Sequence, residues 1–191
     1  AQQTQIAERM AARLPLVGAD AENRETLDSS WRRFALLLNA HLQDHLFIFG
    51  GRPSVADFAI SAQFQQMLLD PTPADWLEDS APFVVAWCEH MEDPHAGGPF
   101  EDLAALSETL APLFADELSA TYLPWASANA ASASRDKKRF SATLGDGVFE
   151  QSTQRYAARA FRAVRSAIAK SSDNTALQDF LETTGAKKYL T

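Results

Sequence analysis

Apolar residues recur along most of the chain at intervals of three or four positions, which is the period of an amphipathic helix. The longest stripe begins after Asp20, taken as an N-cap, and predicts one helix that ends at Gly50-Gly51. Its apolar positions are Leu27, Trp31, Phe34, Leu38, Leu42 and Leu46. A shorter stripe of Ile6, Met10 and Leu14 predicts an earlier helix up to Arg13, followed by a turn at LPLVGAD.

Prolines and hydroxyl residues divide the middle of the chain. Ser54 is placed to cap a helix, and Pro71 and Pro73 are expected to end it. A short helix then begins at Pro82 and stops at Pro94, with Val84, Trp87 and Met91 on one face. Leucines 103, 106, 110 and 113 form the next stripe, which Pro112 should kink or break.

The period changes after about residue 133. Residues 139–144 and 148–153 read as two short strands around Gly145-Asp146-Gly147, so a hairpin is expected near residues 139–153. The helical period then returns, with Tyr156, Ala160, Val164 and Ile168 on one face. A last helix is predicted from a capping box at Thr175 and Gln178 up to Gly185. The fold class is therefore mainly all-α, a helical bundle with a small hairpin and two extra C-terminal helices, in one domain over residues 1–191.

Composition narrows the function classes. Seventeen basic and 25 acidic residues give a formal charge of -8, which argues against a nucleic-acid partner. The only cysteine, Cys88, excludes an intrachain disulfide and Cys-rich metal sites. No apolar run approaches the ~20 residues of a membrane span, and the N-terminus lacks a signal peptide's apolar segment. We therefore expect a cytoplasmic protein without a membrane partner. Because the chain starts at Ala1 inside a helical pattern, we also expect further sequence upstream.

Ser54-Val-Ala-Asp57 has the spacing of a capping box. The Ser54 hydroxyl can accept from the Asp57 backbone N–H, while the Asp57 carboxylate accepts from the Ser54 N–H. The carboxylate also suits the positive end of the helix dipole. No second acid or base lies near Asp57 in the sequence, so a structural role is preferred over a role as a catalytic acid.

With this order of features the chain resembles the C-terminal helical domain of the glutathione transferase superfamily. The stretches that carry the resemblance are LFIFGGRPSVADFAI and APFVVAWCEHMEDP. The matching positions are Phe49, Gly50, Ser54, Ala56, Asp57, Trp87 and Pro94. The resemblance covers roughly residues 6–94, and residues 100–191 look like an extension found in only some members.

The resemblance implies that glutathione and the second substrate are bound by two different domains. Family members bind and activate glutathione mainly through an N-terminal thioredoxin-like domain, and this sequence has no βαβ pattern that could form one. The resemblance thus implies no catalytic residue in this chain, no tightly bound cofactor and glutathione as a co-substrate held by a domain that is missing here. The isolated chain is expected to be inactive. Members are often dimers, so a homodimer is a further expectation, and a non-catalytic protein-interaction module with the same fold is the alternative.

A pocket for a small hydrophobic electrophile is the binding site that the resemblance implies. In the family it lies between the first helix of this domain and later C-terminal segments. Met10 and Arg13 are the candidates on one side, and Tyr122, Trp125 and Asn129 are those on the other. Tyrosine and tryptophan offer large amphipathic surfaces to such a cleft. Simple core packing is the alternative for each of the five residues.

Three further groups have a structural and a functional interpretation. His41 and His45 have a spacing that can hold zinc, but no third ligand is evident and a helix C-terminus also favours histidine. Cys88 lies in an apolar helix, where cysteine is usually inert. The arginines at 155, 159, 162 and 165 can bind an anionic group or form a solvated helix face, and we prefer the solvated face.

Overall fold

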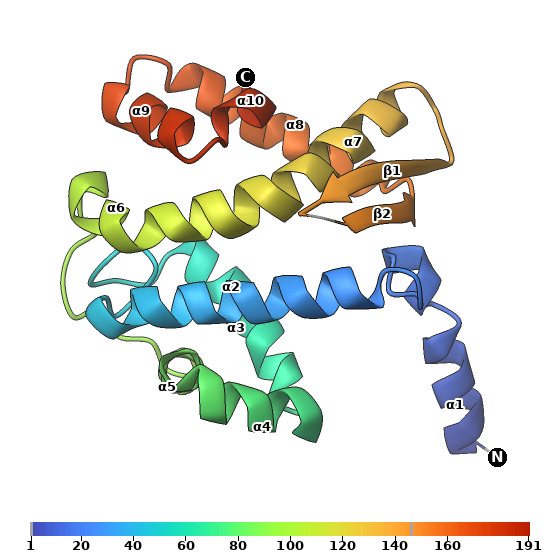
Figure 1. Ribbon diagram of the computed structural model, residues 1–191. Coiled ribbons are helices and arrows are strands. Elements are labelled where there is room, and N and C mark those ends of the chain that lie inside the picture. The colour runs from blue at the N-terminus through green and yellow to red at the C-terminus, as the bar shows by residue number, and fades with distance from the viewer. Residues whose placement is uncertain (1, 146) are drawn as a thin grey trace. The chain divides into compact units, whose positions relative to one another are not determined.

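The computed structural model describes residues 2–145 and 147–191. Over these residues the chain is mainly helical with a two-stranded antiparallel sheet, which confirms the predicted fold class (Figure 1). The chain divides into two compact units. Unit 1 contains Ala1–Trp31 and Phe114–Thr191, and unit 2 contains Arg32–Leu113. The single domain over residues 1–191 stays a prediction, because the division does not say whether the units unfold together.

Unit 2 is built from the larger part of one long helix and four shorter ones. They are α2 (Arg24–Asp44), α3 (Val55–Met67), α4 (Pro71–Ser80), α5 (Pro82–His90) and α6 (Leu103–Pro112). Helix α5 packs against both α3 and α4. Its predicted inner face is correct, since Val84, Trp87 and Met91 are all buried. Phe34 of α2 stacks on Phe64 of α3 with ring centroids 6.0 Å apart.

The long helix α2 is shorter at both ends than the stripe predicts. It begins at Arg24, and the Asp20 carboxylate instead accepts from the backbone N–H of Asn23 in the preceding turn. It ends at Asp44, because the chain then turns inward to bury Phe47 and Ile48 and forms a bridge between Phe47 and Gly50. Leu46 therefore lies outside the helix and is 46% exposed, so its place in the stripe was wrong.

Prolines act differently at two places. Pro71 and Pro73 do not simply end α3; they lie in the first turn of α4, whose N-cap Asp70 accepts from the N–H of Thr72. A first-turn proline loses no helical hydrogen bond, which is why it is tolerated there. Pro112 is the last residue of α6, in agreement with the predicted break, and the chain goes on as the π-helix η2 (Leu113–Tyr122).

Unit 1 joins the beginning of the chain to its end. Its elements besides the start of α2 and most of η2 are α1 (Gln2–Ala11), the 3-10 helix η1 (Leu14–Val17), α7 (Leu123–Ser134), β1 (Arg139–Leu144), β2 (Gly147–Ser152), α8 (Arg155–Lys170), α9 (Thr175–Thr183) and α10 (Lys187–Leu190). Figure 1 shows the hairpin beside α7, and both β1 and α8 contact that helix. Strand β1 has the predicted range of the first strand, and β2 begins and ends one residue earlier than predicted. Of the predicted turn, Asp146 lies outside the described residues.

The two sides of α7 face separate apolar clusters. One lies under the hairpin and contains Phe140, Ala142, Leu144 and Phe149, with Trp125 and Leu27 packed against it. The other is formed with the C-terminal helices and contains Leu123, Ala126, Phe161, Leu181, Ala186 and Leu190. Helix α7 is thus the central element of unit 1, and its largely small residues allow neighbours to approach on both sides.

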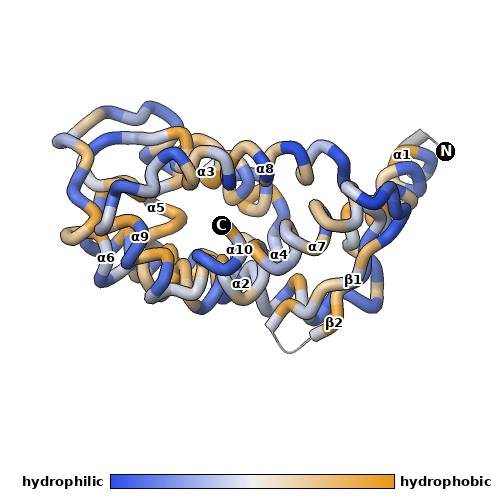
Figure 2. The backbone as a smooth tube through the Cα atoms, turned by 90° about the horizontal axis from the view of Figure 1, so that it is seen from above, coloured by the Kyte–Doolittle hydropathy of each residue, from blue (hydrophilic) through white to orange (hydrophobic). Residues whose placement is uncertain are grey.

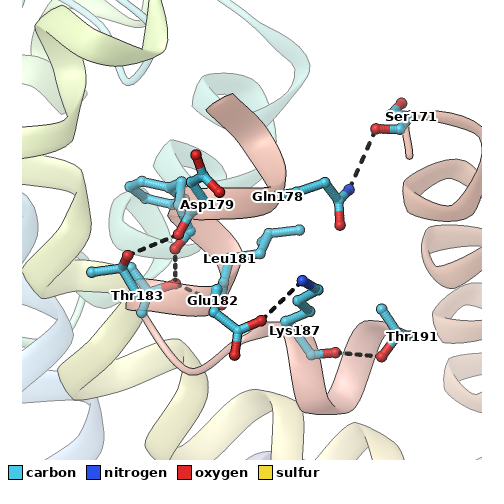
Figure 3. A network of polar contacts seen from close by, with 10 residues as sticks. Ser171, Gln178, Asp179, Leu181, Glu182, Thr183, Lys187 and Thr191 are labelled. Atoms are coloured by element: carbon cyan, nitrogen blue, oxygen red, sulfur yellow. Dashed lines mark hydrogen bonds and ion pairs between the residues drawn. The ribbon is translucent and has the colours of Figure 1, made fainter. Parts of the chain in front are cut away.

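The last helices correct two details of the sequence analysis. The N-cap of α9 is Asn174, whose side chain accepts from the N–H of Leu177, so Thr175 is the first helical residue and no Thr175 box forms. On α8 the buried residues are Ala158 and Phe161. Of the face predicted there, Ile168 packs against the same cluster as Phe161, whereas Tyr156, Ala160 and Val164 are exposed. Figure 3 shows the polar contacts that close this region, including Lys187 to Glu182 at 2.9 Å and Gln178 to the Ser171 carbonyl.

Candidate functional site

An open groove of about 580 Å³ lies in unit 1 where the first helices meet the start of α2. Its wall is mostly apolar and includes Leu14 and Pro15 of η1 with Leu27 and Trp31 of α2. Asp20, Arg24 and Asp28 add charged groups to its edge, and the alanines 11, 19 and 21 complete the lining. Such a surface suits an apolar ligand of small size, with few polar groups to orient it.

Polar side chains from the far end of the sequence hold the wall of this groove. The amide groups of Gln151 and Gln154 both donate to the Leu16 carbonyl of η1, at 3.3 and 2.8 Å. Asn23 is 2% exposed and bonds the carbonyls of Gly18 and Glu150, at 2.8 and 2.9 Å. These contacts were missed by the sequence analysis, because an isolated Asn or Gln carries no pattern that names its partner. The extension therefore supports the groove from behind.

The sequence-predicted pocket residues do not line this groove. Met10 of α1 is 57% exposed, and Arg13 is exposed between α1 and η1. Tyr122 and Trp125 stack on each other with ring centroids 6.1 Å apart, which matches the expectation that they lie on one side. The indole N–H of Trp125 donates to Gln151 Oε1 at 2.8 Å. Trp125 also packs against the same apolar cluster as Leu27, a residue of the groove wall. Its direct contact with a ligand stays a prediction.

Asn129, the fifth candidate, is fully buried on α7. Its Nδ2 donates to the Gln154 carbonyl at 2.9 Å, and its Oδ1 accepts from the Gln154 N–H at 2.8 Å. Both polar atoms of the Asn129 amide are therefore hydrogen-bonded to the backbone of Gln154. In this arrangement the side chain joins α7 to the segment after β2 and is not available to a ligand.

In unit 2 the start of α3 has the geometry of a capping box. The backbone N–H of Ser54 donates to Asp57 Oδ2 at 2.8 Å, while Ser54 Oγ accepts from the N–H groups of Ala56 and Asp57. The hydroxyl of Ser54 also donates to the Asp57 carboxylate at 2.6 Å. Both halves of the reciprocal box are present, so this helix start has its first donors satisfied.

The Asp57 carboxylate does more than complete the box. It is fully buried, and its Oδ1 accepts from the Ile48 N–H at 2.8 Å and from the Trp87 indole at 3.3 Å. One side chain therefore fixes the chain before α3, the start of α3 and the middle of α5. A buried carboxylate is tolerated when several donors satisfy it in this way.

This helix order, with its box and its buried tryptophan, is the part that known proteins share. Residues 21–90 match the family described as glutathione S-transferase, C-terminal domain. That stretch is similar to the C-terminal helical domain of the glutathione S-transferase superfamily. Comparison with curated proteins and with solved structures gives no significant match. The glutathione S-transferase match lies within the predicted range of 6–94 and includes Ser54, Asp57 and Trp87.

The groove combines the glutathione S-transferase stretch with sequence outside it. Arg24, Leu27 and Trp31 belong to the matched residues, whereas Leu14 and Pro15 precede them. The supporting amides of the hairpin lie far beyond the match. Residues within 11–31 thus form the wall of the groove, and Gln151 and Gln154 of the C-terminal extension bond the nearby Leu16 carbonyl.

The two histidines of α2 lie together, and each has a contact of its own. Their rings stack with centroids 4.6 Å apart. His41 Nε2 lies 3.0 Å from the Ile48 carbonyl and Nδ1 lies 2.7 Å from the Thr109 hydroxyl. A carbonyl only accepts, so Nε2 carries the hydrogen and Nδ1 accepts from Thr109. Burial, followed by the nearby His45, lowers the pKa of His41 below its ordinary value.

His45 pairs with a carboxylate instead of a metal. Its Nδ1 lies 3.3 Å from Glu101 Oε2, an ion-pair distance without the direction of a hydrogen bond. Across residues 2–145 and 147–191, no group of three or more His, Cys, Asp or Glu side chains is arranged to hold a metal ion. The zinc interpretation of the His41 and His45 spacing therefore finds no third ligand among the described residues.

Cys88 and the arginines of α8 have the surroundings that the sequence suggested. Cys88 is buried, and burial together with Glu89 raises the pKa of its thiol to about 12. A thiol with this pKa is almost entirely protonated near neutral pH and is a poor nucleophile. Arg155 pairs with Asp136, and Arg165 donates to the Thr191 carbonyl at 2.6 Å.

No helix in the described part of the chain has the length and apolar character to cross a membrane.

Proposed function

We propose that this chain is the hydrophobic-substrate-binding domain of a glutathione S-transferase-like protein. In this proposal a thioredoxin-like domain, which the described residues do not contain, binds glutathione and ionises its thiol. The groove of unit 1 holds an apolar electrophile for attack by that thiolate, so that proximity lowers the barrier. The family match over residues 21–90 is the observation that carries the proposal.

The remaining expectations follow from the same proposal. Glutathione is a co-substrate and no cofactor is tightly bound. The protein functions in the cytoplasm, a reducing compartment in which its one buried cysteine needs no partner. Met10, Arg13, Tyr122 and Trp125 stay candidates for contact with the electrophile.

A conjugation assay tests whether catalysis requires the thioredoxin-like domain. Glutathione and 1-chloro-2,4-dinitrobenzene are mixed with residues 1–191 and, separately, with the full-length gene product. We expect a rate above the uncatalysed reaction only with the full-length protein. Conjugation by residues 1–191 alone would contradict the proposal, because the thiol would then be activated without the second domain.

A binding measurement tests the groove itself. Titration with 1-chloro-2,4-dinitrobenzene should quench Trp31, whose share of the fluorescence is obtained by comparison with Trp31→Phe. Leu14→Asp should weaken binding about tenfold, because a charge in an apolar wall costs desolvation. Leu16→Asp is the matched control, since Leu16 is equally exposed on η1 but does not line the groove. Equal effects of both substitutions would remove the groove from the proposal.

A non-catalytic assembly module is the second candidate function. It is favoured by the exposed apolar residues of α8, where Tyr156 is 77% and Val164 is 45% exposed. The upstream reading frame discriminates between the candidates. A thioredoxin-like pattern ahead of Ala1 supports the enzyme, and an unrelated domain there supports the module.

A further inference from the structure

The edge of the unit 1 groove carries more negative than positive charge. Asp20 and Asp28 line the groove together with one cation, Arg24. A second hollow of about 500 Å³ adjoins the groove and shares Arg24 and Asp28 with it. Glu22 and Glu25 add two further carboxylates to this hollow. Four carboxylates and one guanidinium therefore lie next to the apolar wall.

The change from apolar wall to charged edge follows the chain. Residues 14–17 of η1 are LPLV, whereas residues 20–25 are DAENRE. Figure 2 shows this change as hydrophobic colour in η1 followed by mostly hydrophilic colour in the turn before α2. A ligand that fills the groove therefore has one part against apolar side chains and another part within reach of the carboxylates.

Trp31 gives the groove a surface that attracts positive charge. Its indole lines the groove, and its Nε1 donates to Asp28 Oδ1 at 2.9 Å, so a carboxylate is held beside the aromatic ring. The face of tryptophan attracts cations more strongly than the face of tyrosine or phenylalanine, and ligand ammonium groups are recognised in this way. The Asp28 carboxylate adds Coulomb attraction for the same charge.

Two other classes of charged ligand fit the groove less well. A guanidinium such as that of Arg24 suits an anion, but Glu22, Glu25 and Asp28 line the same hollow and repel one. A bare metal ion needs several ligands at once, and no group of three acidic, histidine or cysteine side chains in residues 2–145 and 147–191 is arranged to hold one. An organic cation with an apolar body meets neither obstacle.

We propose that the groove of unit 1 accepts a small apolar compound that carries an ammonium group. The apolar body packs against Leu27 and the Trp31 ring, and the ammonium group lies towards Asp28. Glu22 and Glu25 add long-range attraction, because carboxylates of one sign around a hollow raise the local concentration of cations. The inference rests on the proposed function, since it names the class of electrophile that this groove takes.

Three naphthalene probes that differ in the charge of one substituent test the assignment by isothermal titration calorimetry. They are 1-naphthylmethylammonium, the neutral 1-naphthylmethanol and the anionic 1-naphthoate. We expect the cation to bind residues 1–191 about fivefold more tightly than the alcohol in low salt, and the anion about fivefold more weakly. In about 1 M salt, where the screening length falls to ~3 Å, the three dissociation constants should approach one another.

Charge-neutralising variants locate the preference. Glu22→Gln with Glu25→Gln should reduce the advantage of the cation over the alcohol about twofold. The affinity for the alcohol should stay unchanged, because neither side chain lines the apolar groove. Asp28→Asn keeps an oxygen that accepts from the Trp31 N–H, so it should also lower the advantage about twofold without loss of the aromatic wall.

Glu78→Gln with Asp79→Asn is the matched control. It removes the same charge from exposed residues that line neither hollow, so the preference for the cation should persist. Equal affinities for the three probes in low salt, or a control that acts like the groove variants, would overturn the inference and leave the apolar groove of the proposed function in place. Tighter binding of the naphthoate would overturn it in favour of an anion at Arg24. Binding of none of the probes would contradict the groove itself, and with it both proposals.

Discussion

Two buried polar networks, one in each unit, join segments over different distances in the sequence. In unit 2 the carboxylate of Asp57 accepts from four donors, which come from residues 48, 54 and 87. In unit 1 two amide side chains bond backbone groups far away in sequence; Asn23 reaches Glu150 and Gln151 reaches Leu16. The Asp57 network lies within the family match, while the amides join the first residues to the extension. One region of the sequence therefore encodes the first network, whereas the second needs residues from both ends of the chain.

The largest expected effect is at Asp57. Asp57→Ala leaves the buried N–H groups of Ile48 and Trp87 without an acceptor, which should cost about 3 kcal/mol of unfolding free energy. Urea unfolding measures this loss. Asp57→Asn, which keeps one acceptor oxygen, should cost less. Affinity for 1-chloro-2,4-dinitrobenzene per folded molecule should hardly change, and a large loss in a stable variant would return Asp57 to the binding site.

Asn129 gives the corresponding test in unit 1. Asn129→Ala removes both bonds to the Gln154 backbone and should cost about 2 kcal/mol. Hydrogen exchange sharpens the comparison between the two variants. If residues 1–191 form one domain, each variant lowers protection in both units; protection lost only in the unit that carries the substitution would contradict that prediction.

Gly18 is the next test, because it joins η1 to the hairpin. Its φ is +77°, and an added Cβ would lie 2.6 Å from the Phe149 ring. Gly18→Ala should therefore cost the roughly 1–2 kcal/mol of left-handed backbone, and it should cost more than Gly185→Ala because the Phe149 ring must move. Gly185→Ala supplies the control, since its φ is +69° and no atom lies near the added Cβ. Thermal unfolding of both variants separates strain from collision, and equal losses would show that the ring yields freely.

His41 gives the smallest effect near neutral pH. Its pKa is lower in the folded chain than the ordinary 6.5, so the unfolded chain binds the proton more readily. Stability from this group is thus complete above about pH 6.5 and falls as the pH drops towards the folded pKa. The slope is at most about 1.4 kcal/mol per pH unit. Unfolding of the natural chain and of His41→Gln between pH 7 and about 5 checks it; parallel curves would exclude His41 as the cause.

Features encoded by neighbouring residues were predicted well. The box at Ser54 and Asp57, the first-turn Pro82 and the hairpin strands each depend on a short motif. Helix ends that depend on tertiary contacts were not predicted correctly. No motif within residues 44–48 shows that the chain turns inward after α2. The Ile48 N–H donates to the carboxylate of Asp57, which lies outside that stretch.

The site shows the same limit. Tyr122 and Trp125 lie close together, as their helical spacing suggested, and the structure adds that their rings stack. The bonds of Asn129 to Gln154 and of Gln151 to Leu16 do not follow, since an amide can pair with any backbone group that the fold presents. On α8 three of the four residues in the predicted stripe are exposed, while Ala158 and Phe161 are buried. Periodicity alone cannot say which part of a wide apolar arc is covered.

Chemical labelling of Cys88 can measure how often unit 2 opens locally. The thiol is buried and its pKa is raised to about 12, so a thiol reagent should label it only while the surrounding helices are apart. As the sole cysteine of the sequence, it reports on α5 without any engineered probe. The rate of labelling in native buffer therefore measures how often the helices around Cys88 separate. Equilibrium unfolding does not give this rate.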